Sequence, residues 1–180
     1  MPHNEIILPE TVDIPVPLYK SLQGRYFVGH TPDLDFSGED MQAWASLYNP
    51  PDSGVNMFVN VWTVTSYYSG YRAELRLNAR MPGRPSVSCF FTPTNTTLNT
   101  RPKALITYAE DVTGEPHGGV FPYLRVGDAF TTLVSEEDSK FIIGEGGSFS
   151  ILLSHPDMPK AREMANIAFG WSEKPLHECN

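Results

Sequence analysis

Proline and glycine interrupt this chain at short intervals, which limits it to short secondary-structure elements. The chain has 16 prolines and 14 glycines, and both residue types mark turns. The segments between them are rich in Val, Phe, Tyr, Thr and Ile, which are enriched in strands. We therefore predict short strands at residues 25–29, 55–65, 71–79, 87–92, 104–109, 121–126, 130–135, 140–143, 148–154 and 166–171.

The alternation of side chains indicates how these strands are buried. In residues 71–79, Ala73, Leu75 and Leu77 fall on one face and polar side chains on the other. This pattern predicts one buried face and one solvated face. Neither face of residues 55–65 is clearly polar, so we expect that strand to be central or covered on both sides.

Helical patterns are weak in this sequence. Residues 41–48 and 158–167 are the two candidates, and NPPDSG ends the first of them at Asn49. A doubly wound α/β fold would need helices between its strands. About ten short strands with turn signals every ~8–12 residues instead predict an all-β fold, either a single β-sandwich or a jelly roll.

The length of the chain fits one domain. A chain of 180 residues and 20.1 kDa is large enough to bury its own core without metals or disulfides. We predict an extended N-terminal arm at residues 1–24, a β-sandwich domain at residues 25–172 and a C-terminal tail at residues 173–180.

Apolar side chains alternate through TVDIPVPLYK, residues 11–20. Successive side chains of an extended segment point to opposite sides, so this pattern predicts a strand. The prolines at positions 15 and 17 cannot donate to a ladder, which restricts the segment to the edge of a sheet. It either covers an edge of its own domain or adds to the sheet of a neighbouring subunit. The expected subunit contacts are Ile6, Ile7, Leu8, Val12, Ile14, Val16 and Leu18.

The charge distribution argues against two classes of partner. The formal net charge is −8, and the 13 Lys and Arg residues form no basic run. We therefore expect neither a nucleic-acid surface nor binding to an anionic membrane. The sequence also has no apolar stretch long enough to span a bilayer, and MPHNEIILPE lacks the pattern of a secretory signal.

The two cysteines do not form a disulfide framework. Cys89 lies in VSCFF and is predicted to be a small buried residue within a strand. Cys179 lies in the polar C-terminal tail and is predicted to be exposed. Its thiol either links two subunits or stays reduced.

One acidic segment resembles half of a calcium-binding loop. Asp33, Asp35, Ser37 and Gly38 match the first positions of an EF-hand loop, but Trp44 stands where the bidentate Glu is required. We interpret the segment as an acidic surface loop and predict no metal site.

Other motifs for cofactors and catalysis are missing from the sequence. GEGGSF, residues 144–149, lacks the Lys and Ser/Thr of a phosphate-binding loop and is predicted to be a tight turn. The acidic pair Glu136 and Glu137 lies in SEEDSK, which we interpret as a solvated hairpin turn. The five histidines are dispersed and give no zinc spacing. We predict no cofactor and no enzymatic activity.

Aromatic residues in YYSGY suggest an alternative function. Tyr67, Tyr68 and Tyr71 lie in an apparent hairpin loop, where exposed aromatic rings could stack on a sugar or contact a partner. The sequence thus also allows a carbohydrate-binding or surface-binding module.

Four stretches resemble an uncharacterised family, a domain of unknown function from spore-forming bacteria. They are NPPDSGVNMFVNVWTVT (residues 49–65), FTPTNT (91–96), LVSEEDSKFIIGEGGSFSILL (133–153) and IAFGW (167–171). The third stretch is the most specific. The resemblance implies a probable source and no function.

The architecture also resembles that of subunits of spore-surface appendages, although only loosely. That resemblance implies assembly inside the mother cell, docking by strand complementation through N-terminal arms, and cysteine links between subunits. The N-terminal arm of this chain has no cysteine, which puts a covalently linked fibre in doubt.

These observations together predict a non-enzymatic structural protein. We expect it to be a homo-oligomer or helical polymer of itself, built as a filament or shell through its N-terminal arm. It is expected to be made in the cytoplasm without a signal peptide and to reach the spore surface, the cell surface or the exterior. A component of a virion, in its decoration or tail, is a further alternative.

Overall fold

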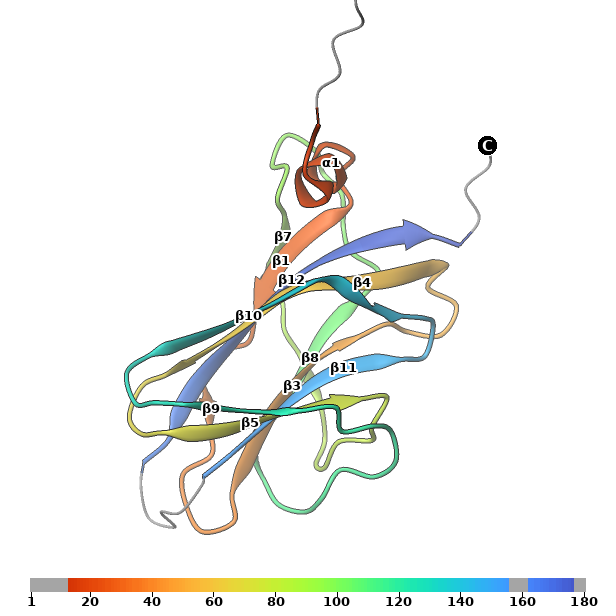
Figure 1. The fold of residues 1–180 in the computed structure, drawn as a ribbon. Coiled ribbons are helices and arrows are strands. Elements are labelled where there is room, and N and C mark those ends of the chain that lie inside the picture. The colour runs from red at the N-terminus through yellow and green to blue at the C-terminus, as the bar shows by residue number, and fades with distance from the viewer. Residues whose placement is uncertain (1–12, 156–161, 177–180) are drawn as a thin grey trace, which may run out of the picture.

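The computed structural model describes residues 13–155 and 162–176, and these form two antiparallel sheets packed face to face (Figure 1). The predicted all-β sandwich is therefore confirmed. The first sheet, sheet A, has the order β10 (Thr132–Ile143), β4 (Val55–Ser66), β12 (Met164–Pro175), β1 (Tyr26–His30) and β7 (Phe91–Pro93), with β2 (Leu34–Asp35) paired to β12. The second, sheet B, has the order β6 (Ser86–Val87), β8 (Leu105–Val112), β3 (Gln42–Tyr48), β11 (Ser148–Ser154), β5 (Tyr71–Leu77) and β9 (Leu124–Gly127).

The main core lies between the two sheets. Trp62 of β4 and Trp171 of β12 are fully buried there, together with Phe149 of β11. The predicted alternation in β5 is confirmed, because Ala73 and Leu75 are buried and their neighbours are partly exposed. Burying aromatic and aliphatic surface between the sheets is the main source of stability for such a fold.

The predicted helix at residues 41–48 is wrong, because this segment forms β3 in the middle of sheet B. Five successive residues of β3 are buried, so both faces of the strand are covered. The outer face carries Trp44, which forms a second apolar cluster with Ala109, Val112 and Leu152. A continuous apolar segment is compatible with a helix and with a doubly covered strand, and here the strand is formed. The second predicted helix, 158–167, is also wrong from Met164 onward, where β12 begins.

The predicted strands at 130–135 and 140–143 are one strand, β10, and the predicted hairpin turn between them is wrong. Its pairing with β4 shifts register between Glu136 and Phe141. Asp138 and Ser139 have φ values of 47° and 62°, which residues other than glycine rarely adopt. The SEEDSK segment is thus a β-bulge that interrupts an edge strand.

The predicted strand at 87–92 is split, because the chain crosses from one sheet to the other there. Ser86 and Val87 pair with β8 in sheet B, whereas Phe91–Pro93 pair with β1 in sheet A. Cys89 lies in the crossing segment and is exposed. The prediction of a buried Cys89 is therefore wrong.

The predicted extended conformation of residues 11–20 is wrong in its second half, because α1 (Val16–Leu22) is an α-helix. Pro17 lies in the first turn of α1, where the missing N–H costs no hydrogen bond. The spacing of Ile14, Leu18 and Leu22 fits a helical stripe as well as the alternation fits a strand. Four of the predicted contact residues, Ile6, Ile7, Leu8 and Val12, lie outside the described residues.

The predicted boundary at residue 172 falls inside β12, which continues to Pro175. Among the described residues, no helix is long and apolar enough to cross a membrane.

Two adjacent glycines allow a matched test of the packing beside β5. Gly118 and Gly119 have φ values of 68° and 66°. A Cβ atom on Gly119 would lie 2.3 Å from the Leu77 carbonyl oxygen and 2.6 Å from the Ala79 nitrogen, whereas one on Gly118 would meet nothing within 4 Å. Gly118→Ala is expected to lower the free energy of unfolding by about 1 kcal/mol through backbone strain. Gly119→Ala should cost about 2 kcal/mol more because backbone atoms must move. Urea unfolding of both variants measures the difference, and equal losses would contradict the predicted clash.

Candidate functional site

The helix α1 exposes its apolar side chains. None of its residues is buried. Leu18 and Leu22 lie one turn apart on the helix and are 51% and 57% exposed, and Ile14, which precedes the helix, is 45% exposed. An isolated helix of this length is unstable in water, and most helical stability comes from packing an apolar face. The helix α1 lies at one end of the sandwich (Figure 1), and within the described residues its apolar side chains Leu18 and Leu22 stay exposed.

The C-terminal end of α1 is nevertheless fixed to the sandwich. The Arg25 backbone N–H donates to the Lys20 carbonyl oxygen at 2.9 Å. The Thr94 hydroxyl donates to the Ser21 hydroxyl at 2.8 Å, and the Thr100 hydroxyl donates to the Gly24 carbonyl oxygen at 2.8 Å. These bonds hold the polar side of α1 and leave its apolar stripe free.

A cleft of about 600 Å³ lies between α1 and sheet A. Val16, Pro17 and Lys20 line it on the helix side, and Phe58 and Lys174 line it on the sheet side. The helix thus lies beside the outer face of sheet A without closing onto it.

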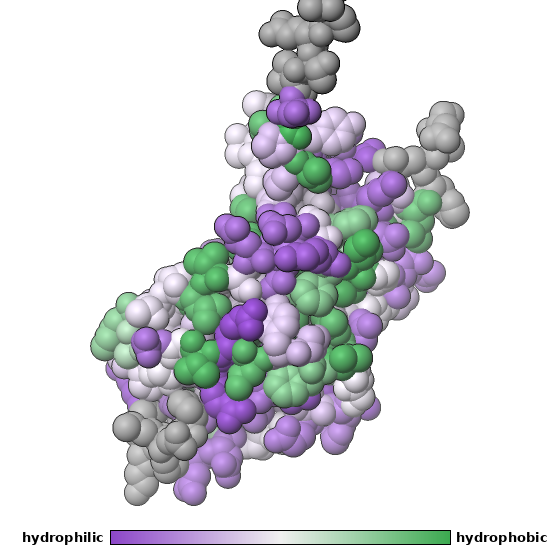
Figure 2. Space-filling model, viewed as in Figure 1, coloured by the Kyte–Doolittle hydropathy of each residue, from purple (hydrophilic) through white to green (hydrophobic). Residues whose placement is uncertain are grey.

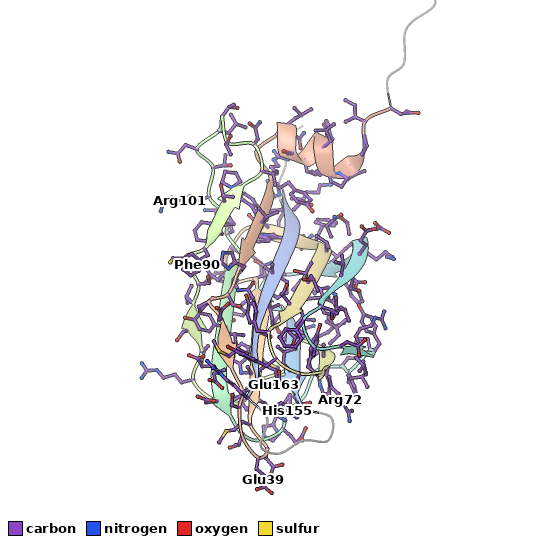
Figure 3. The ribbon with its side chains drawn as sticks, turned by 90° about the vertical axis from the view of Figure 1, so that its left-hand side faces the viewer. Glu39, Arg72, Phe90, Arg101, His155 and Glu163 are labelled. Atoms are coloured by element: carbon purple, nitrogen blue, oxygen red, sulfur yellow. The ribbon has the colours of Figure 1, made fainter. Side chains whose placement is uncertain are left out.

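A second hollow, the apolar groove, lies further along the outer face of sheet A. Its volume is about 490 Å³. The lining comes from strands β1, β4, β7 and β12 and from the residue just before β7, and it includes Val28, Val61, Phe90, Phe91 and Ala168. Phe90 lies on the side of the sandwich, between α1 and the opposite loop end (Figure 3).

Two features shape the apolar groove. The His30 ring stacks on Phe90, with 4.9 Å between centroids and 5° between planes. A Cβ atom on Gly170 would lie 2.8 Å from Val61 and 2.9 Å from the Tyr26 hydroxyl. Glycine at position 170 therefore lets Val61 and Tyr26 pack over the strand at the groove, where a Cβ atom would clash with both.

The edges of both sheets offer little room for an added strand. β7 has three residues and ends at Pro93, β6 has two residues and β9 has four. The longer edge strand β10 is interrupted by the bulge at Asp138 and Ser139. Short or bulged edges are devices that prevent strand addition. The described edges therefore disfavour the addition of a strand from another chain.

Exposed apolar residues also occur beyond the apolar groove. On the face seen in Figure 2 they form separate patches over β9 and β10 and around α1, among polar residues. Val126, Val134 and Ile142 contribute to this surface. These three residues line neither the cleft beside α1 nor the apolar groove.

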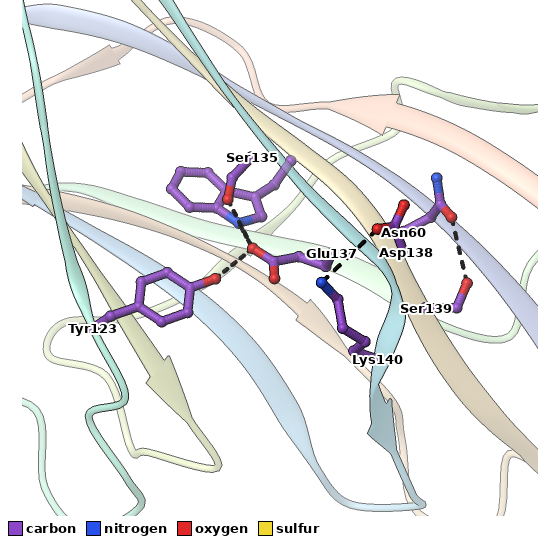
Figure 4. A network of polar contacts seen from close by, with 8 residues as sticks. Asn60, Tyr123, Ser135, Glu137, Asp138, Ser139 and Lys140 are labelled. Carbon is purple, nitrogen blue, oxygen red and sulfur yellow. Dashed lines mark hydrogen bonds and ion pairs between the residues drawn. The ribbon is translucent and has the colours of Figure 1, made fainter.

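Glu137, which the sequence placed in a solvated turn, is buried in the bulge of β10. Its Oε1 atom accepts hydrogen bonds from Trp62 Nε1 at 2.9 Å, from the Ser135 hydroxyl at 2.8 Å and from the Tyr123 hydroxyl. Burial acts to raise the pKa of Glu137, but these bonds outweigh it and lower the pKa below its usual value. All three donors satisfy one oxygen (Figure 4), so the carboxylate has a structural role.

Glu173 has a similar position in β12. It is buried, and it accepts hydrogen bonds from the backbone N–H groups of Lys103 and Ala104 and from Trp171 Nε1. Both buried tryptophans, Trp62 and Trp171, are therefore paired with a glutamate. The two carboxylates thus tie separate segments of the chain to the buried tryptophans.

The predicted tyrosine loop is only partly exposed. Tyr67 and Tyr68 are on the surface, but Tyr71 is fully buried and its hydroxyl donates to the Val64 carbonyl oxygen at 3.1 Å. Burial raises the pKa of Tyr71 to about 12. The prediction of Tyr71 as a ligand residue is therefore wrong. The Tyr67 hydroxyl donates to Asp33 at 3.1 Å, which restrains that ring.

The acidic segment that resembles a calcium loop forms the short strand β2 and the turn after it, and Leu34 and Phe36 within it are fully buried. Asp35 Oδ1 accepts from the Ser37 backbone N–H at 2.8 Å, and Trp44 is buried in β3. Within residues 13–155 and 162–176, no group of three or more His, Cys, Asp and Glu side chains is placed to hold a metal ion. GEGGSF forms a turn between β10 and β11, as predicted, with Gly146 at φ 76°. Cys179 lies outside the described residues.

The apolar groove was missed at the sequence level, because strands far apart in the chain build it. Phe90 and Phe91 gave a signal, since two adjacent aromatic residues of an extended segment are not expected to enter one core together; both are exposed and line the groove. Gly170 gave no signal of its own.

A family model described as "Family of unknown function (DUF6143)" matches residues 1–178. No curated protein matches the chain.

Proposed function

We propose a non-enzymatic structural function for this chain, which belongs to the DUF6143 family of unknown function. In this proposal, α1 of one copy docks into the apolar groove of a second copy, and the copies build a filament or shell. The observation that carries the proposal is the helix itself. Leu18 and Leu22 are exposed apolar side chains one turn apart on a seven-residue helix with no buried residue, and Ile14, just before the helix, is exposed as well. Such a helix gains stability by packing against a partner.

The apolar groove fits a helix as its occupant. An amphipathic helix binds a hydrophobic groove through side chains spaced three or four residues apart. Leu18 and Leu22 have this spacing, and the groove offers Val28, Phe91 and Ala168 without a charged side chain among its lining residues. Leu18 and Leu22 are 51% and 57% exposed, so burying the surface that remains accessible contributes roughly 1.5–3 kcal/mol before the costs of association.

Docking between copies would repeat along an assembly. The helix and the apolar groove are different surfaces of the chain, so each copy offers one donor and one acceptor. A head-to-tail contact of this kind gives a ring if the rotation closes and a filament if it does not. In this proposal the N-terminal arm makes the contact between subunits, as the sequence predicted. It does so through the helix α1, where a donated strand was expected. The loose resemblance to appendage subunits supports assembly on a spore or cell surface.

Salt is expected to strengthen the association. Each copy carries a formal net charge of −8, so copies repel one another at low ionic strength. Added salt screens this repulsion, and sulfate also strengthens apolar burial. Sedimentation velocity at rising sodium sulfate concentration should show larger species. A contact held by ion pairs would weaken instead.

Complementary variants test both surfaces. Leu18→Asp combined with Leu22→Asp should abolish association by removing the helix stripe, and Val28→Asp should do so by charging the apolar groove. A mixture of the two should recover a dimer, because each partner retains one intact surface. Val120→Asp, at a residue that is 62% exposed and outside the groove, is the matched control. Association of the helix variant at the level of the parent chain would refute the proposal.

A further inference from the structure

The cleft between α1 and sheet A, here called the helix cleft, has the composition of a small-molecule site. Its volume is about 600 Å³, within the range of such sites, which combine mostly apolar walls with a few polar groups. Val16 and Pro17 line it on the helix side, and Phe58, which is partly exposed, lines it on the sheet side. The stems of two lining lysines add apolar surface. An alkyl chain in the helix cleft therefore buries apolar surface on both sides.

Cations gather at the helix cleft although the chain as a whole is acidic. The formal net charge is −8, yet Lys20 of α1 and Lys174 of β12 line the cleft with one carboxylate, Asp138. That carboxylate is already paired, since its Oδ2 atom lies 3.8 Å from Lys140 Nζ (Figure 4). Neither Lys20 nor Lys174 forms an ion pair with a carboxylate in residues 13–155 and 162–176. The helix cleft therefore favours an anionic group over a cationic one.

The bulge of β10 supplies polar groups at the rim of the helix cleft. Asp138 and Ser139 both line it, and their φ values are 47° and 62°. Bulges often re-aim side chains beside functional sites, and strained backbone concentrates at ligand clamps. The Ser139 hydroxyl donates to Asn60 Oδ1 at 3.4 Å (Figure 4), which connects the rim to β4. The bulge therefore shapes the helix cleft as well as burying Glu137.

The helix cleft is separate from the surfaces of the proposed self-association. In a helix of about 3.6 residues per turn, the cleft-lining positions 16, 17 and 20 of α1 fall on the side opposite Leu18 and Leu22. The apolar groove shares no lining residue with the helix cleft. A ligand in the helix cleft thus leaves the docking side of α1 free. Failure of self-association would leave this site intact.

We propose that the helix cleft binds an amphiphilic monoanion, an alkyl carboxylate of medium chain length. The alkyl chain packs against Val16, Pro17 and Phe58, and the carboxylate pairs with the ammonium groups of Lys20 and Lys174. Ion pairs close to solvent are individually weak, so affinity requires the chain and the head group together.

Four probes separate the alkyl chain from the head group in an NMR titration of backbone amides. Octanoate, octanol and octylammonium share one alkyl chain, and acetate has the carboxylate without that chain. We expect octanoate to bind at least ~10-fold more tightly than octylammonium, octanol to fall between them, and acetate to cause no shifts at the same concentrations. The shifted amides should belong to α1, to β4 around Phe58 and to the end of β12. Octylammonium binding as tightly as octanoate, shifts confined to the apolar groove, or no shifts with octanoate would overturn the proposal.

Variants assign the two parts of the contact. Lys20→Met and Lys174→Met should each weaken octanoate binding by roughly 2- to 5-fold and leave octanol binding unchanged, because methionine retains an apolar stem. Phe58→Thr should weaken the binding of both, since threonine suits a strand but offers less apolar surface. Lys103→Met, at an exposed lysine that does not line the helix cleft, is the matched control and should bind octanoate as the parent chain does. The amide spectrum of each variant establishes that it is folded, and unchanged octanoate affinity in folded Lys20→Met and Lys174→Met would contradict the assigned contacts.

Discussion

Replacement of Glu137 by alanine is expected to lower the free energy of unfolding by about 3 kcal/mol. The side chain accepts hydrogen bonds from Trp62, Ser135 and Tyr123. Removing the carboxylate leaves these three donors without their acceptor, and Trp62 is fully buried in the main core. An unpaired buried donor loses its hydrogen bonds to water without replacement, so the cost exceeds that of an ordinary surface substitution.

Glu136 provides a matched control for Glu137. It is the adjacent residue of the same strand, has the same side chain and is exposed. Glu136→Ala should change stability by no more than about 0.5 kcal/mol. Denaturant unfolding at neutral pH measures both variants. Equal, small effects would show that the bulge of β10 does not depend on the buried carboxylate.

The Glu137 network also has a pH dependence of defined sign. Its pKa in the folded chain lies below the usual value of 4.5. The contribution to stability is therefore complete above about pH 4.5 and is lost as the pH falls through the lowered pKa. The difference in stability between the parent chain and Glu137→Ala should shrink in acid.

Replacement of Glu163 is expected to change stability in the opposite direction from replacement of Glu137. Glu163→Gln should raise the free energy of unfolding at pH 8. Glu163 is fully buried, and neither carboxylate oxygen has a hydrogen-bond partner among the described residues. Burial raises its pKa to about 7, although the backbone of Ser69 acts to lower it. Between about pH 4.5 and 7 the folded state holds a proton that the unfolded state has released, so stability falls as the pH rises.

Glutamine at position 163 retains the shape of the protonated carboxyl and does not ionise. The two chains should have similar stability at pH 5. At pH 8, Glu163→Gln should be more stable by up to about 3 kcal/mol. Comparison at the same pH cancels the contributions of other titrating groups, including His155. A constant difference between pH 5 and pH 8 would mean that Glu163 ionises normally in the folded chain.

The sandwich could be predicted from the sequence because most strands are marked by local patterns, namely turn residues at their ends and alternating apolar and polar side chains. β4 and β5 lie between the turn residues that bound them, and the inward side chains of β5 alternate with polar ones. Such local patterns do not depend on the rest of the fold. The same reasoning placed the GEGGSF turn correctly, because glycine tolerates the positive φ of Gly146.

The errors arose where distant residues determine the local structure. β3 resembles a helix because both of its faces are buried, and the burial of Trp44 depends on strands far along the chain. SEEDSK resembles a turn because its charges suggest solvent, yet Glu137 finds donors on β4 and before β9. Neither partner is close in sequence, so a local pattern cannot reveal them.

The candidate surfaces were predictable only in part. Ile14, Val16 and Leu18 were identified as contact residues from their pattern, and they are exposed, but the same pattern suggested a strand where α1 forms. The apolar groove is assembled from strands far apart in the chain, β1, β4, β7 and β12. Its existence follows from the pairing order of the strands, which the sequence did not reveal.

Photo-crosslinking between copies tests the central claim most directly. A photoreactive benzoylphenylalanine at position 18 would be placed in a chain of normal isotopic composition and mixed with an isotopically heavy chain that lacks it. Docking of α1 in the apolar groove of another copy predicts crosslinks from position 18 to heavy peptides that contain Val28 or Phe91. Crosslinks confined to the light chain itself, or heavy crosslinks that avoid the groove, would contradict the account.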